Sequence, residues 1–230
     1  MTNPLWSPSV EHIEQSNMWD FMQCVNKNYQ NNFHDYSSLY QWSIDYPSLF
    51  WPAVWDFCSI IASQRWQHVL VNGKTLEDSQ WFTGSKLNFA ENLLRFSQGK
   101  YKQQAAIIFW GEDQVKRKLS YGELFTNVAQ LAQFLKGAGV GEGDRVAAFM
   151  PNLPETVIAM LATTSLGAIW SSCSPDFGFN GVLDRFEQIK PKVLFTADGY
   201  FFKGKIIDSL STVSKLESAL LSIQHVVVVP

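Results

Sequence analysis

The second half of this chain alternates short apolar runs with longer amphipathic segments, and this alternation constrains the fold more than any other feature. The apolar runs predict strands over 105–110, 145–150, 168–172, 193–196 and 226–229. Residues 115–119 are expected to pair back on the first of them as a hairpin. Continuously apolar strands joined by helix-length connections indicate a parallel sheet with helices on both faces. The sequence therefore predicts an α/β fold with a doubly wound, mainly parallel sheet.

The segments between these strands carry helix signals. Ser120 and Glu123 have the spacing of a capping box, which satisfies backbone amides that the first helical turn leaves without partners. Asn152 and Asn180 are expected to cap the next two helices, and apolar residues at helical intervals predict a further helix over 205–221. Each predicted strand except the last is thus followed by a predicted helix or hairpin.

The first half of the chain has a different texture. Seven of the nine tryptophans lie in the first 81 residues, where apolar side chains recur at helical spacing from Trp19 and again after Pro47. We therefore expect a helical, Trp-rich amino-terminal extension over 1–100 and an α/β region over 101–230. Because the chain stops at Pro230, directly after a strand, we expect the sheet to be incomplete. An uncovered apolar edge at the last strand then predicts self-association.

Composition excludes several classes of function. The chain has 18 Lys and Arg against 21 Asp and Glu and no basic stripe, so nucleic-acid binding is not expected. The apolar runs are too short to cross a membrane, and the amino terminus lacks a signal-peptide pattern, so a cytoplasmic location is predicted. The cysteines and histidines are few and scattered, which predicts neither a disulfide framework nor a metal site. Cys173 is interpreted as a small buried apolar residue rather than a nucleophile.

Parallel sheets bind ligands beyond the carboxyl ends of their strands, where loops lead into helices. The candidate loops are 151–154, 173–180 and 197–205. The third contains G-x-x-x-x-G-K, but Ile206 follows where a phosphate loop needs Ser or Thr for magnesium. Lys203 and Lys205, at the start of a predicted helix, are candidates to bind an anion through charge and helix dipole. The alternative is that both are solvated surface lysines.

Four sequence blocks carry a resemblance to a known family. Residues 81–94, WFTGSKLNFAENLL, resemble the first motif of the acetyl-CoA synthetase group of adenylate-forming acyl-CoA ligases, and 143–146, 150–155 and 166–171 resemble its next motifs. Within that group, the stretch from Trp170 to Gly178 is most similar to acetoacetyl-CoA synthetases. It has Pro-Asp-Phe-Gly where acetyl-CoA synthetases usually have Gly-Gly-Phe-Ser.

The resemblance implies an activity and its cofactors. Enzymes of this group join a carboxylic acid to ATP as an acyl-adenylate, release pyrophosphate, and pass the acyl group to coenzyme A. It implies acetoacetate or a similar short acid as substrate, and ATP, magnesium and coenzyme A for the complete enzyme, within lipid metabolism. In acetyl-CoA synthetases, the segment after Thr-Ala-Asp carries arginines near the coenzyme A nucleotide. Lys205 matches one of these arginine positions and Phe202 matches another, and Lys203 is adjacent. A lysine keeps the charge but loses bidentate phosphate binding.

Relatives in this family are several hundred residues longer. Their phosphate loop, their magnesium and ribose carboxylates and their catalytic lysine match no segment here, so 101–230 is expected to be only the first part of the large domain. We therefore assign no catalytic residue and expect the isolated chain to be inactive. Coenzyme A is expected to be its only ligand, and the remainder of the enzyme is expected to be its partner. A non-catalytic binding or assembly module with weak coenzyme A affinity is the alternative, and a phosphate-loop hydrolase built on 199–206 is a third interpretation.

Overall fold

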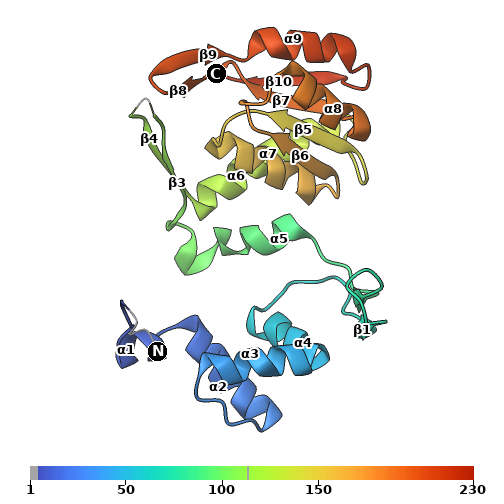
Figure 1. The fold of residues 1–230 in the computed structure, drawn as a ribbon. Helices are drawn as coiled ribbons and strands as arrows, with labels where there is room; N and C mark the ends of the chain where they lie inside the picture. Colours follow the sequence, from blue (N-terminus) through green and yellow to red (C-terminus); the bar gives the residue numbers. More distant parts are fainter. Residues whose placement is uncertain (1–4, 113) are drawn as a thin grey trace. The chain divides into compact units, whose positions relative to one another are not determined.

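The computed structural model describes residues 5–112 and 114–230 (Figure 1). The chain divides into two compact units, Met1–Leu87 and Asn88–Pro230.

The first unit is mainly helical. Its elements are α1 (Val10–Glu14), α2 (Asn17–Tyr29), α3 (Tyr36–Asp45), α4 (Pro47–Phe57), β1 (His68–Val71) and β2 (Gln80–Thr83). The helices predicted around Trp19 and after Pro47 are confirmed as α2 and α4, and Pro47 lies in the first turn of α4, where a missing amide proton costs nothing. The antiparallel pair β1–β2 was not predicted, because strands this short leave no periodic signal.

Aromatic side chains form the core of the first unit. Phe21, Val25, Leu39 and Trp42 are buried, and Phe50 packs against them. The rings of Phe21 and Phe50 meet edge to face, with centroids 5.8 Å apart and planes at 87°. This geometry is favourable beyond the burial of area. The richness in tryptophan and phenylalanine is therefore explained by a small core that large rings fill.

The second unit contains the predicted α/β fold. Its elements are α5 (Phe89–Leu94), the 3-10 helices η1 (Arg95–Ser97) and η2 (Gly99–Tyr101), β3 (Ala105–Trp110), β4 (Lys116–Ser120), α6 (Tyr121–Gly137), β5 (Arg145–Phe149), α7 (Pro154–Ser165), β6 (Ile169–Cys173), α8 (Phe179–Ile189), β7 (Val193–Ala197), β8 (Gly199–Phe202), β9 (Lys205–Asp208), α9 (Leu210–Ala219) and β10 (His225–Val229). The central sheet has four parallel strands in the order β10-β7-β5-β6. The pairs β3–β4 and β8–β9 are antiparallel hairpins. The predicted fold class and the hairpin after the first strand are confirmed.

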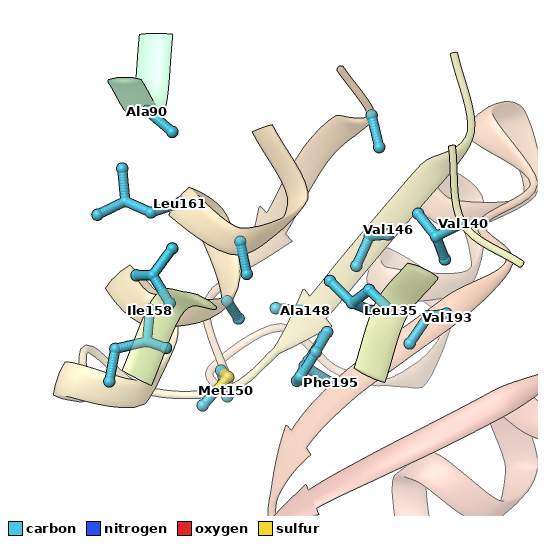
Figure 2. Packing of buried hydrophobic residues seen from close by; sticks show 14 of the residues in the cluster. Ala90, Leu135, Val140, Val146, Ala148, Met150, Ile158, Leu161, Val193 and Phe195 are labelled. Carbon is cyan, nitrogen blue, oxygen red and sulfur yellow. The ribbon is translucent and has the colours of Figure 1, made fainter. Parts of the chain in front are cut away.

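Both faces of the central sheet are buried. Alternate side chains of β5 point to opposite sides: Val146 and Ala148 join the core under α6 and α7, whereas Ala147 and Phe149 join the core under α8 and α9. Figure 2 shows the first of these cores, in which Val146, Ala148 and Phe195 lie among residues of the covering helices. The mainly apolar character of β5 and β7 follows from this burial on two sides.

One of the three predicted helix caps is where the sequence placed it. Ser120 and Glu123 form a reciprocal capping box at the start of α6. The other two predictions were wrong. Leu153, not Asn152, is the residue that precedes α7, and its backbone amide donates a hydrogen bond to the Thr156 hydroxyl at 3.3 Å. Gly178 precedes α8, so Asn180 lies inside that helix.

The predicted helix over 205–221 was wrong in its first part. Residues 205–208 form β9, which pairs with β8, and the helix α9 begins only at Leu210. Lys203 and Gly204 both adopt left-handed backbone conformations, with φ of 50° and 73°, as a two-residue hairpin turn of type I′ requires. The apolar residues of β9 and α9 also fit a single helical stripe, so periodicity alone could not separate the two elements.

The strand β10 lies at one edge of the central sheet. It pairs in parallel with β7, and in the described part of the chain no strand pairs with its other side. Val228 on this strand is 45% exposed. An apolar edge strand without charges is a template for pairing with another chain. The self-association inferred from the sequence stays a prediction.

Candidate functional site

The carboxyl ends of the parallel strands carry the three loops that the sequence singled out. Residues Pro151 and Asn152 follow β5, residues 174–178 follow β6, and the β8–β9 hairpin follows β7. Because the strands run parallel, these segments meet at the same edge of the sheet. The structure therefore brings the three candidate loops together, as expected.

Two cavities of about 300 Å³ and about 450 Å³ lie at this edge. They share Pro151, Asn152, Tyr200 and Phe201, and together we call them the carboxyl-edge crevice. The smaller cavity is also lined by the segment 172–176, and the larger one by the β3–β4 hairpin and the end of β10. The crevice thus has both apolar walls and polar loop ends, which is typical of small-molecule sites.

The larger cavity has charged groups of both signs. The Arg117 guanidinium on β4 pairs with the Glu155 carboxylate in the first turn of α7, through two hydrogen bonds, one of them 3.2 Å long between Nη1 and Oε2. A bidentate pair of this kind fixes both side chains. The Glu112 carboxylate accepts the backbone amide of Lys203 at 2.9 Å, which joins the β3–β4 hairpin to the β8–β9 hairpin.

The smaller cavity is lined by several hydroxyl groups, a thiol and a carboxylate. The Tyr200 hydroxyl donates to the Pro175 carbonyl at 3.3 Å, and the Ser174 hydroxyl donates to the Asp176 carboxylate at 3.2 Å. Cys173 is buried, and this burial raises the pKa of its thiol. A thiol held protonated is a poor nucleophile, so the interpretation of Cys173 as a small apolar residue stands.

Of the two lysines proposed from the sequence, Lys203 lies in the turn of the β8–β9 hairpin and Lys205 is the first residue of β9. Both are exposed, and neither is among the described residues that line the crevice. The Lys203 ammonium lies 5.1 Å from the ring centroid of Phe202, which does line the smaller cavity. The expectation that these lysines begin a helix was wrong, so no helix dipole contributes to an anion site there.

The phosphate-loop interpretation of residues 199–206 is contradicted by the same hairpin. A phosphate loop wraps its backbone amides around an anion and leads into a helix. Here Phe201 is instead paired with Ile206 in an antiparallel ladder. Backbone groups of these two strands are engaged with each other and do not form a phosphate cradle.

Several residues of the crevice were not predicted. Glu112 in the β3–β4 turn, Arg117 on β4 and Glu155 on α7 lie outside the three candidate loops, and no local motif joins them to Tyr200, which lies inside the predicted loop 197–205. Their assembly depends on tertiary structure.

Across residues 5–112 and 114–230, no three His, Cys, Asp or Glu side chains gather closely enough to hold a metal ion. No helix in the same residues is both long and apolar enough to span a bilayer.

An open parallel sheet with a crevice beyond the carboxyl ends of its strands defines an α/β ligand-binding domain. The chain belongs to the AMP-binding enzyme family, whose model matches residues 94–230. A second model, described as the acetyl-coenzyme A synthetase N-terminus, matches residues 36–93. The family resemblance stated from the sequence motifs is confirmed.

Individual relatives agree with this assignment. The chain is 46% identical over 217 residues to an acetoacetyl-coenzyme A synthetase of Rhizobium meliloti, covering 94% of this chain and 33% of the relative. It is 35% identical over 227 residues to a malonamoyl-CoA synthetase of Penicillium aethiopicum, covering 97% of this chain and 31% of the relative. A solved structure of an acetoacetyl-CoA synthetase from Streptomyces lividans superposes with a TM-score of 0.93 at 37% identity, over 100% of this chain and 35% of that one. The chain therefore spans about a third of the length of these relatives.

Proposed function

We propose that this chain is the amino-terminal part of an acid–coenzyme A ligase that acts on acetoacetate. In this reaction a carboxylate oxygen attacks the α-phosphorus of ATP and pyrophosphate leaves. The sulfur of coenzyme A then attacks the acyl carbon, and AMP leaves. The observation that carries the proposal is the 46% identity to a protein named acetoacetyl-coenzyme A synthetase, over nearly the whole of this chain.

The names of the relatives narrow the class of acid. Acetoacetyl and malonamoyl groups both place a carbonyl on the β-carbon of the acid, and they differ by a methyl against an amino group of similar size. We therefore propose short acids with a β-carbonyl as the substrate class. A site that hydrogen-bonds this oxygen would reject acids without it, because its own polar groups would then stay unpaired.

The carboxyl-edge crevice is proposed to contribute part of the coenzyme A site. Its loops end the parallel strands, and the hairpin that carries Lys203 and Lys205 forms one of its walls. The lysines are proposed as contacts for the phosphate groups of the coenzyme, outside the crevice proper. Magnesium is assigned to no residue of this chain, because the described residues offer no cluster that would hold it. A cytoplasmic setting stays a prediction.

The first test compares residues 1–230 with the longest product of the gene. For the longer product we expect pyrophosphate release that depends on ATP, magnesium and a β-carbonyl acid, with acetate and butyrate as the matched acids that lack the carbonyl. For residues 1–230 alone we expect no turnover, because charge stabilisation at the phosphates needs groups that this chain does not supply. Absence of acid-dependent pyrophosphate release from the longer product contradicts the ligase proposal. If that product still binds coenzyme A, the non-catalytic module is supported instead.

The second test concerns Lys205. Lys205→Ala is expected to weaken coenzyme A binding to this chain about two- to fivefold, since an exposed charge contributes little. The loss should shrink as salt is raised. Calorimetry with coenzyme A measures it, and Lys215→Ala, which removes an exposed lysine from α9, is the control. Equal affinities of wild type and Lys205→Ala remove Lys205 from the site.

A further inference from the structure

Tyr200 is one of the four residues that line both cavities of the crevice. Its backbone pairs with Ile207 in the β8–β9 hairpin, and the residue is half-buried. A change at Tyr200 therefore affects the walls of both cavities.

The hydroxyl of Tyr200 connects the hairpin to the loop between β6 and α8. It donates a hydrogen bond to the carbonyl of Pro175, 25 residues earlier in the chain, at 3.3 Å. The ring of a phenylalanine would fill the same space without this bond. The connection is therefore a property of the hydroxyl alone.

The other described hydrogen bonds of the loop 174–177 are internal, and the Phe177 ring lies 4.3 Å from the Arg185 guanidinium of α8. The amide of Asp176 donates to the Ser174 hydroxyl at 3.4 Å, and the amide of Phe177 donates to the Ser174 carbonyl at 3.2 Å. Among the described hydrogen bonds of these four residues, the one from Tyr200 reaches another element. Exposed segments with few such bonds open at a small cost in free energy.

The hairpin, in contrast, is anchored to the central sheet at its base. The amide of Asp198 donates to the Val229 carbonyl of β10 at 3.0 Å, and the amide of Ser209 donates to the Asp198 carbonyl at 3.1 Å. Tyr200 thus joins a hairpin that is hydrogen-bonded to the central sheet with a loop whose other described hydrogen bonds are internal.

The phenol of Tyr200 stays a donor over the ordinary pH range. Burial raises its pKa, and the negative charge of Asp176 raises it further. A phenolate would lose the proton that the Pro175 carbonyl accepts.

We infer that Tyr200 is a positioning residue, whose hydroxyl holds the loop 174–177 against the β8–β9 hairpin and so sets the width of the crevice for coenzyme A. The role of the coenzyme in this inference rests on the proposed function. The hold on the loop rests on the geometry alone.

The experiment compares wild type, Tyr200→Phe and Tyr121→Phe in residues 1–230. Tyr121→Phe removes a phenol hydroxyl from the start of α6, away from the residues that line the crevice. Hydrogen exchange of the Asp176 and Phe177 amides reports on the loop, and calorimetry reports coenzyme A affinity. In Tyr200→Phe we expect faster exchange at these two amides and affinity weaker by about two- to tenfold, the net worth of one hydrogen bond. Exchange in β5 and β7 and the melting temperature should match wild type.

The outcomes distinguish the positioning role of Tyr200 from the proposed coenzyme A site. Unchanged loop exchange in Tyr200→Phe overturns the positioning role. A lower melting temperature together with faster exchange throughout the sheet also overturns it, because this result would show that Tyr200 only stabilises the fold. Failure of wild type itself to bind coenzyme A contradicts the proposed coenzyme site, while the exchange data still decide whether Tyr200 holds the loop. Tyr200→Leu, which removes ring and hydroxyl together, should show at least the same faster loop exchange as Tyr200→Phe, and normal exchange in this variant overturns the inference.

Discussion

Phe186→Ala is expected to destabilise the second unit by about 3–5 kcal/mol, which is a large part of the stability of a typical domain. Phe186 is fully buried on α8 and packs with Val182 and Leu216 against the sheet. Truncation removes a whole ring and leaves a cavity, because side chains in a close-packed core relax only in part.

The measurement is denaturant-dependent hydrogen exchange of peptides from β5 and β7. This readout isolates the second unit, whereas tryptophan fluorescence would report mainly on the first. Phe134→Ala is the matched control, since Phe134 is 48% exposed on α6. A loss below about 1 kcal/mol for Phe186→Ala, or an equal loss in the control, would show that α8 does not pack as the structure describes.

Gly199→Ala is expected to distort the β8–β9 hairpin at a cost of about 1–3 kcal/mol, the range for overpacking. A Cβ at Gly199 would lie 2.7 Å from the backbone carbonyl oxygen of Ile207 on the paired strand. The contact is with backbone, so it can be relieved only by moving the two strands apart. Tyr200 and Phe201, which line the crevice from this hairpin, would move with them.

Hydrogen exchange over residues 199–208, together with coenzyme A affinity, tests this prediction. Gly141→Ala serves as the control, because a Cβ at Gly141 has no neighbour within 4 Å. We expect faster exchange and weaker binding in Gly199→Ala only. Wild-type exchange in this segment would mean that the two strands approach each other less closely than the structure describes.

The strands of the central sheet could be predicted from the sequence because burial on two faces demands uninterrupted apolar runs. The run from Val193 to Thr196 is such a case, and it is buried throughout in β7. The capping box of Ser120 was equally readable, since its two hydrogen bonds join residues three apart. Signals of this kind are local and do not depend on the rest of the fold.

The secondary structure of the segment from Lys205 to Asp208 could not be predicted from local sequence. Its apolar residues suit a helix and a strand alike, and pairing with β8 decided between them. That result removed the helix terminus on which the lysine anion site had been argued. It also revealed Tyr200, whose partner Pro175 lies in a different loop.

The amino-acid sequence by itself determined the α/β class, the strands of the central sheet and the family, because apolar periodicity and motif residues are properties of neighbouring positions. Only the tertiary structure decided which side chains face the crevice and how they are held. Contacts such as Tyr200 with Pro175 and Arg117 with Glu155 join residues far apart in the chain, and they form only where parallel strands end at a common edge.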